Sequence, residues 1–199
     1  MDMADATGEG YPLVLQSGAD PSTLGGVAVC GLTTVGSVGV IAASHLIASL
    51  GLKPMGTVIH PEFPAVALIQ ESVPKHPVRV YQGEEMGVFI SEIQFPQASD
   101  FQFGNTVLEW FQKGGFDRLV IIDGLVSEDL GLKEDGDIWG VASLQSGRDA
   151  LDTVGIQRIQ QGIVTGVSGF LLAEGERQGL DITVPVSYTH LRAHETRCN

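Results

Sequence analysis

The stretch Gly26-Val27-Ala28-Val29-Cys30-Gly31, with the glycine-spaced segment Leu32-Thr33-Thr34-Val35-Gly36-Ser37-Val38-Gly39 after it, decides the fold. The first segment is a compact apolar run between glycines, which is typical of a strand buried on both faces of a sheet. Residues 40–50 are apolar almost throughout and stop at Gly51, so they predict a helix. We expect this helix to be buried because it has so little polar face.

Strand and helix signals alternate along the rest of the chain. Helices are predicted after Ser99, whose spacing to Gln102 resembles a capping box, and over 170–178. The connections between the middle strands are too short for crossover helices, so some of these strands should be antiparallel. The fold class is therefore α/β, a three-layer α/β/α sandwich around a mixed sheet. The predicted strands lie near residues 13–15, 57–59, 65–69, 78–81, 88–90, 119–122, 163–165 and 182–184.

The chain is expected to hold one domain over residues 11–186. Residues 1–10 are polar and glycine-bearing and predict a disordered lead-in. Residues 187–199, SYTHLRAHETRCN, differ in composition from everything before them and resemble the translated sequencing-adapter tails of some assembled reading frames. We expect this tail to be non-native and the domain to be truncated at its C-terminal end, so we assign no function to His190, His194 or Cys198.

The charge balance excludes several functions. The 199 residues hold 11 Lys and Arg against 24 Asp and Glu, a formal net charge of −13, which disfavours binding to nucleic acids and to anionic membranes. The start of the chain lacks the basic and apolar regions of a secretory signal, and two cysteines are too few for a disulfide framework. These features predict a cytoplasmic protein.

The glycine-spaced turn is the one candidate ligand site. Gly31 and Gly36 have the spacing of a P-loop, but Ser37 follows directly and the lysine that reaches the phosphates is missing. Only the Gly36-x-x-Gly39 half of a dinucleotide fingerprint is present. Two interpretations stay open: the glycines permit a tight turn and close packing of the helix on the strand, or the turn is an anion site at a helix N-terminus.

Other candidate residues match no catalytic, cofactor or metal template. His60 stands beside prolines and is interpreted as a turn residue, and His45 in the apolar helix as a core histidine. Ser168 lacks the second glycine of a nucleophile elbow, and Cys30 in a buried strand is interpreted as a small apolar residue. The acidic stretch 128–137 does not have calcium-loop spacing and is interpreted as a solvated loop. We therefore predict no catalytic residue, no metal and no cofactor.

The order of several short motifs resembles that of the PAC2 family, the proteasome assembly chaperones and their archaeal and actinobacterial relatives. The resemblance covers residues 12–185 and is carried by several weak motifs in the right order. These are Val27 to Cys30, Val35-Gly36-Ser37-Val38-Gly39, Leu50-Gly51-Leu52, Gly56-Thr57-Val58, His60-Pro61-Glu62-Phe63-Pro64-Ala65, Pro77-Val78-Arg79-Val80-Tyr81, Leu108-Glu109-Trp110 and residues 162–172 from Gly162 to Leu172.

The resemblance implies a fold similar to that of purine nucleoside phosphorylases, a homo-oligomer, and a non-enzymatic role in helping proteasome α subunits assemble. The alternative is a nucleoside-, nucleotide- or phosphate-binding enzyme of phosphorylase-like architecture, which would use Gly31, Gly36, Ser37 and Gly39 as its anion site. One fold can host unrelated functions, so the resemblance to a fold does not by itself choose between them.

Overall fold

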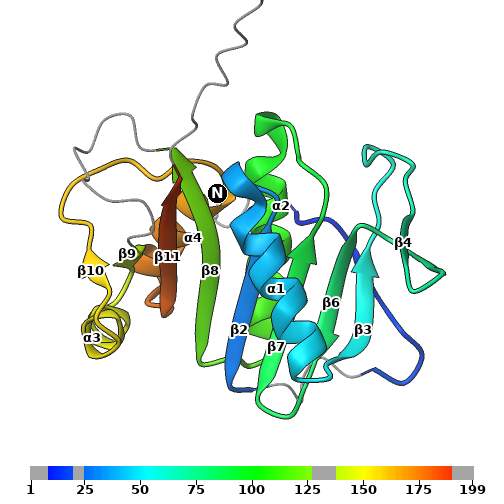
Figure 1. The fold of residues 1–199 in the computed structure, drawn as a ribbon, viewed down its shortest axis with the longest axis horizontal. Coiled ribbons are helices and arrows are strands. Elements are labelled where there is room, and N and C mark those ends of the chain that lie inside the picture. The colour runs from blue at the N-terminus through cyan, green and yellow to red at the C-terminus, as the bar shows by residue number, and fades with distance from the viewer. Residues whose placement is uncertain (1–8, 20–24, 127–137, 190–199) are drawn as a thin grey trace, which may run out of the picture.

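The computed structural model describes residues 9–19, 25–126 and 138–189 (Figure 1). Within them, a nine-stranded sheet has the order β1-β3-β6-β7-β2-β8-β11-β9-β10, and β4 and β5 form a separate hairpin. The strands of the large sheet are β1 (Leu13–Leu15), β2 (Val27–Leu32), β3 (Lys53–Val58), β6 (Val78–Gln82), β7 (Met86–Ser91), β8 (Arg118–Val126), β9 (Ile138–Ala142), β10 (Gln157–Arg158) and β11 (Ile182–Thr189). The hairpin strands are β4 (Leu68–Gln70) and β5 (Val73–Lys75).

The sheet is mixed, as predicted. At its centre β2 runs parallel to both β7 and β8, and β11 runs parallel to β8. The neighbours joined by short connections, β3 with β6 and β6 with β7, are antiparallel. This agrees with the expectation from the short connections between the middle strands, because a parallel pair needs a crossover segment.

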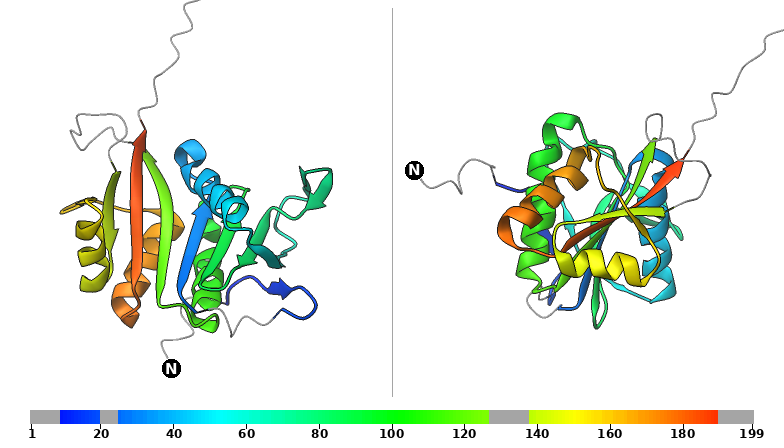
Figure 2. Two further views of the ribbon diagram at one scale, coloured as in Figure 1. Left: turned by 60° about the horizontal axis from the view of Figure 1, so that its bottom comes forward. Right: turned by 90° about the vertical axis from the view of Figure 1, so that its left-hand side faces the viewer.

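Helices cover both faces of the sheet, which makes three layers (Figures 1 and 2). On one face α2 and α4 close the main core, which includes Phe89, Phe103, Trp110, Leu171 and Ile182. On the other face α1 packs on β2, β7 and β8, and α3 packs on β9 and β10. The helices are α1 (Val38–Ser49), α2 (Asp100–Lys113), α3 (Gln145–Thr153) and α4 (Gly166–Gln178), with short 3-10 helices η3 (Val35–Ser37) and η4 (Gln97–Ser99).

Helix α1 is not buried as predicted. Only Gly39 and Ala43 are fully buried in it, while Ile41 is 65% exposed and Leu50, just past its end, is 55% exposed. His45 is exposed too, 3.3 Å from the hydroxyl of Ser49, so the interpretation of His45 as a core histidine is wrong. The reason is that α1 touches the sheet along one narrow side, and no other described element covers its opposite side (Figure 1).

Three further predictions of local structure are corrected. Ser99 makes no side-chain cap hydrogen bond to α2, so there is no capping box. Residues 163–165 form no strand, because α4 already begins at Gly166 and Thr165 is its N-cap. The strand predicted near 119–122 is longer, since β8 runs on to Val126, paired with β11. The acidic stretch 128–137 lies outside the described residues.

The predicted non-native tail, residues 187–199, begins inside β11. Ser187, Tyr188 and Thr189 pair in register with residues 124–126 of β8, and residues 190–199 lie outside the described part. The non-native origin of this tail, the boundary at 186 and the single-domain interpretation remain predictions. Among the described helices, none has the length and apolarity needed to cross a membrane.

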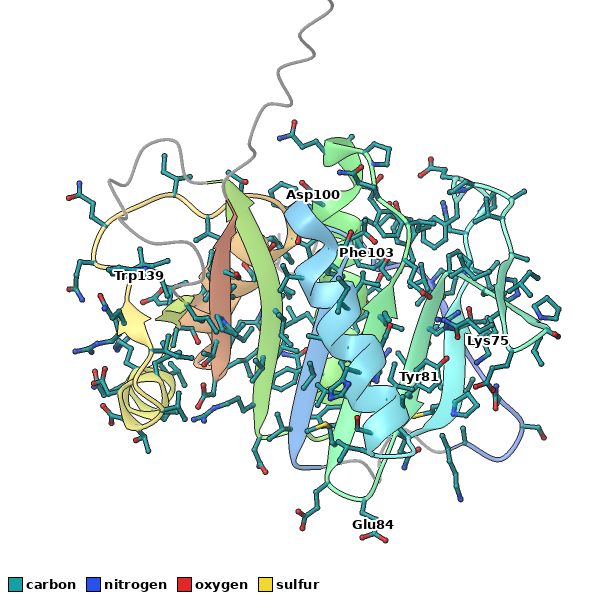
Figure 3. All side chains as sticks on the ribbon, viewed as in Figure 1. Lys75, Tyr81, Glu84, Asp100, Phe103 and Trp139 are labelled. Carbon is teal, nitrogen blue, oxygen red and sulfur yellow. The ribbon has the colours of Figure 1, made fainter. Side chains whose placement is uncertain are left out.

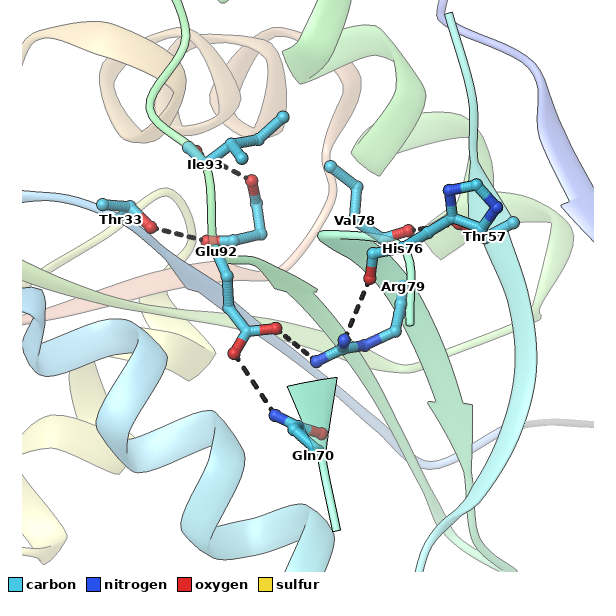
Figure 4. A network of polar contacts seen from close by, with 9 residues as sticks. Thr33, Thr57, Gln70, His76, Val78, Arg79, Glu92 and Ile93 are labelled. Atoms are coloured by element: carbon cyan, nitrogen blue, oxygen red, sulfur yellow. Dashed lines mark hydrogen bonds and ion pairs between the residues drawn. The ribbon is translucent and has the colours of Figure 1, made fainter. Parts of the chain in front are cut away.

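A buried ion pair attaches the β4–β5 hairpin to the sheet (Figure 4). The guanidinium of Arg79 on β6 donates to the carboxylate of Glu92 and, at 2.9 Å, to the carbonyl of His76. The side chains of Arg79 and Glu92 are only 7% and 16% exposed. Gln70 of the hairpin donates to the second oxygen of Glu92 at 3.4 Å, so one carboxylate connects β4 to the end of β7. This network therefore fixes the hairpin to β6 and β7 in the interior of the sheet.

Candidate functional site

A pocket of about 260 Å³ lies where the parallel strands β2, β7 and β8 end. We call it the strand-end pocket. The chain leaves β2 towards α1 on one face of the sheet and leaves β7 towards α2 on the other face. Two adjacent parallel strands whose connections diverge in this way create a crevice, which is the usual place for a ligand in an open α/β sheet. Its lining residues are Leu32, Thr33, Thr34, Ser91, Ile93, Gln94, Phe95, Asp100, Phe103, Asp123, Gly124, Thr165, Gly166, Val167 and Ser168.

The carboxylate of Asp123 is a buried charged group in the lining of this pocket. Its side chain is on β8 and the residue is only 5% exposed. One carboxylate oxygen accepts a hydrogen bond of 2.5 Å from the hydroxyl of Ser168, in the first turn of α4, and the other accepts from the backbone N–H of Gly124 at 2.7 Å. Two donors on different elements therefore fix the orientation of this carboxylate.

Hydroxyl groups from the neighbouring strand ends complete the polar part of the lining. Thr33 donates to the carbonyl of Ser91 at 2.9 Å, which ties β2 to β7. Thr34 accepts from the backbone N–H of Gly124 at 3.3 Å, which ties the end of β2 to β8. Ser91 donates to the carbonyl of Ile93 at 3.0 Å. The pocket thus has a hydrogen-bonded frame that spans the three central strands.

Asp100 supplies a second carboxylate at the first residue of α2. Partial burial raises the pKa of the Asp100 carboxyl above its usual value, because desolvation disfavours the charged form. Asp100 and Phe103 lie at the same end of the sheet (Figure 3). The rings of Phe103 and Phe95 pack with centroids 4.1 Å apart and form the apolar wall of the pocket. The lining therefore combines two carboxylates, several hydroxyls and an aromatic wall.

The residues that the sequence offered as a candidate anion site, Gly31, Gly36, Ser37 and Gly39, do not line this pocket, although Leu32, Thr33 and Thr34 of the same turn do. Gly36 and Ser37 have positive φ values of 72° and 53°, so they form the tight turn between β2 and α1. A Cβ atom at Gly31 would lie 2.4 Å from the Cβ of Ala43, and one at Gly39 would lie 2.3 Å from the carbonyl oxygen of Ile122. These approaches support the interpretation in which glycines allow α1 to pack closely on the strands.

The remaining candidates lie apart from the strand-end pocket. Cys30 is fully buried in β2, and burial, with a smaller contribution from the charge of Asp123, raises the pKa of its thiol far above the usual value. His60 is in a turn, with its ring 4.5 Å from that of Tyr11 and its Nδ1 accepting from the N–H of Glu62. Across the described residues there is no group of three or more His, Cys, Asp or Glu placed to hold a metal ion.

Reasoning from the sequence did not find this pocket. Asp123 directly follows a strongly predicted buried strand, and Ser168 lies near the start of a predicted helix; Asp100 begins another helix. These positions could have indicated a site, because the carboxyl ends of parallel strands meet at one edge of a sheet and ligands bind there. Using this rule requires the strand order, which places β2 between β7 and β8.

A second and wider depression, of about 1030 Å³, lies at the opposite ends of the strands. It is lined in part by residues 16–19, 50–55 and 82–86. Residues 20–24, which follow its first segment in the chain, lie outside the described part. Backbone hydrogen bonds such as Gln16 to Met55 and Val27 to Glu85 join its lining. The strand-end pocket in addition holds a buried carboxylate fixed by a side-chain donor, so we take it as the candidate site.

The fold of this chain is similar to that of several solved structures. Pyrococcus furiosus PbaA, described as an archaeal homologue of proteasome-assembly chaperone, superposes with a TM-score of 0.77 at 26% identity, over 91% of this chain and 73% of PbaA. A protein of unknown function from Thermoplasma acidophilum gives a TM-score of 0.74 at 24% identity, over 87% and 72%. Pyrococcus furiosus PbaB, described as an archaeal proteasome activator, gives 0.72 at 17% identity, over 92% and 81%, which shows a shared fold. No curated protein matches the chain.

The fold and the strand-end pocket define a three-layer α/β protein with a small polar crevice at the carboxyl ends of its parallel strands. The sequence model described as "PAC2 family" matches residues 28–194. The chain belongs to the PAC2 family, as its motif order indicated.

Proposed function

We propose that this protein is a non-enzymatic proteasome-assembly chaperone or scaffold that binds proteasome α subunits. The observation that carries the proposal is membership of the PAC2 family together with the similarity in sequence and fold to PbaA, described as an archaeal homologue of proteasome-assembly chaperone. The proposal places the protein in the cytoplasm, together with its α-subunit partners.

Co-purification tests this role. The tagged chain is expected to retain α subunits when mixed with separately purified α and β subunits from its native host, and not to retain β subunits, which serve as the matched control. Native gels of the mixture should show α subunits entering ring-sized species faster when the chain is present. A chain that melts sharply, and is therefore folded, but retains no α subunit and leaves ring formation unchanged would refute the proposal.

We also propose that the protein is a homo-oligomer whose copies associate through α1. This helix carries no Asp, Glu, Lys or Arg, although the chain as a whole has a net charge of −13. Two copies therefore meet with least electrostatic repulsion at this helix, where Ile41 and Leu50 are exposed. A second copy covering this side would also remove exposed apolar surface from water.

The test of the oligomer is a mass measurement by light scattering after size exclusion. Ile41→Glu is expected to reduce the mass to that of the monomer. Val154→Glu is the matched control, because Val154 is 68% exposed beside α3 and the substitution adds the same charge elsewhere. A wild-type monomer, or an Ile41→Glu variant with the wild-type mass, would contradict association through α1.

The alternative enzyme, with Gly31, Gly36, Ser37 and Gly39 as an anion site, has less support. Gly31 and Gly39 pack closely against Ala43 and the carbonyl oxygen of Ile122. The neighbouring strand-end pocket has no lysine, arginine or histidine in its lining that could bind phosphate. A thermal-shift screen with phosphate, nucleosides and nucleotides separates the two functions, since a ligand that prefers the folded state raises the melting temperature. We expect no shift, and a concentration-dependent rise would favour the enzyme.

A further inference from the structure

The strand-end pocket has an excess of negative charge that its own lining does not neutralise. Asp100 and Asp123 are both lining residues, and the other lining residues include no cation. The ion pairs of the described residues use other acids, so neither carboxylate has a cationic partner there. The donors on Asp123 are a hydroxyl and an amide, which are neutral and supply no counter-charge.

A buried charge without a counter-charge is costly, and a cation entering the pocket would relieve that cost. Asp123 is suited to bind a cation because Ser168 and Gly124 already fix its carboxylate. Binding would therefore cost little conformational entropy of this side chain. Partial burial raises the pKa of Asp100 because desolvation disfavours its charged form, and a cation in the pocket would favour that form again.

The dimensions of the pocket limit what the cation can be. Its volume of about 260 Å³ is below that of usual drug-sized sites and is suited to one amino-acid side chain. The wall formed by Phe95 and Phe103 provides apolar surface for an alkyl stem and aromatic rings beside the positive group. A planar guanidinium can in addition bind a carboxylate through two parallel hydrogen bonds.

Two exposed apolar side chains flank lining residues in the sequence. Phe101, next to Asp100, is 61% exposed and packs edge-on against Phe170, with centroids 5.2 Å apart. Ile163, two residues before Thr165, is 86% exposed. These exposed apolar residues, which neighbour lining residues in the sequence, offer apolar surface to the residues that flank an inserted charged side chain.

We propose that the strand-end pocket binds the guanidinium or ammonium group of an arginine or lysine side chain presented by a partner polypeptide whose flanking residues are apolar. The proposal does not depend on the proteasome role or on association through α1. It concerns the strand-end pocket, whereas the proposed association surface is the exposed side of α1 around Ile41, so each can fail alone.

The first experiment measures binding of the fluorescently labelled peptide acetyl-Leu-Arg-Leu-amide by anisotropy. The matched peptide replaces arginine with citrulline, which has the same shape without the charge, and n-butylguanidinium competes as the free cation. We expect the arginine peptide to bind at least about tenfold more tightly than the citrulline peptide, as loss of a charge-assisted pair predicts. Amide resonances of Thr34, Gly124 and Gly166 should shift on titration.

Variants locate the site. Asp123→Asn keeps the shape of the side chain and is expected to weaken the arginine peptide at least about tenfold. Asp149→Asn on α3 removes the same charge from an exposed position and should leave binding unchanged. Asp100→Asn, at a more exposed carboxylate, should weaken binding about threefold and serves as the second pocket variant if Asp123→Asn does not fold.

Several results would overturn the proposal. No binding to the wild type at millimolar peptide, equal binding of the citrulline peptide, or undiminished binding by folded Asp123→Asn and Asp100→Asn would each exclude a cation site. If n-butylguanidinium binds as tightly as the peptide and depends on Asp123 in the same way, the occupant is a free cation and not a partner polypeptide.

Discussion

The carboxylate of Asp123 on β8 accepts a 2.5 Å hydrogen bond from the hydroxyl of Ser168 on α4, and this contact joins residues 45 positions apart in the chain. Both residues are almost fully buried, at 5% and 2% exposure. The bond attaches the N-terminus of α4 to the end of a central strand. It therefore shapes the strand-end pocket and contributes to the stability of the whole sheet.

Ser168→Ala should lower the free energy of unfolding by about 1.5–3 kcal/mol, because a buried carboxylate loses one of its two donors. Chemical denaturation measures this loss. Ser49→Ala, at an exposed serine of α1, is the control and should change stability by less than about 0.5 kcal/mol. Equal effects of the two substitutions would show that the Asp123–Ser168 bond is unimportant for folding.

Gly39→Ala should destabilise the protein by about 1–3 kcal/mol, because its Cβ would lie 2.3 Å from the carbonyl oxygen of Ile122 and 3.0 Å from Leu32. The added methyl forces α1 away from the sheet. Gly162→Ala is the control, since the nearest side-chain atom to its Cβ would be 3.6 Å away. Thermal melting compares the two variants, and a Gly39→Ala protein as stable as Gly162→Ala would contradict the packing role of the turn.

Glu92→Gln should cost about 3–5 kcal/mol of stability, because it leaves the guanidinium of Arg79 buried without a counter-charge. Glu109→Gln breaks the exposed pair with Lys113, whose side chains are 48% and 68% exposed, and should cost about 0.5 kcal/mol or less. Urea denaturation resolves a difference of this size. The double change Arg79→Met with Glu92→Leu should recover part of the loss, and its failure to do so would indicate that the hydrogen bonds matter more than the charge.

Cys30 should not react with thiol reagents in the folded protein. Burial raises the pKa of its thiol and blocks access, and only the thiolate is a good nucleophile. In a Cys198→Ser chain, Cys30 is the single cysteine, so Ellman's reagent at pH 8 should release no colour until guanidinium is added. Full reaction within minutes under native conditions, without unfolding, would contradict its placement in the core.

The sequence was sufficient to predict elements whose patterns are strong on their own. The apolar run around Val29, the glycine stop at Gly51 and the short connections of the middle strands correctly indicated a mixed α/β sheet. The pattern of apolar residues did not predict burial correctly where burial depends on how other elements pack against a helix. The apolar composition of α1 predicted a covered helix, yet Ile41 faces outward, because composition does not reveal how many sides of a helix other elements reach.

The candidate site could not be predicted because its parts come from separate segments. Asp100, Asp123 and Ser168 follow no spacing rule, and they meet only because β2 lies between β7 and β8. The glycine turn, by contrast, has a local pattern that motif templates detect, and the structure gives its glycines a close-packing contact. Local motifs are visible in a sequence, whereas a pocket at strand ends requires the topology.

The position of β2 in the sheet also sets the order in which the chain can fold. Val27 to Leu32 leave the ribosome early, but their hydrogen-bonding partners begin only at Met86 in β7 and at Arg118 in β8. Until those residues are made, the apolar strand has two unpaired edges, which are sites for aggregation. Pairing over such separations is also intrinsically slow. A protein of this topology should therefore refold slowly, and its nascent chain should need protection until β8 is complete.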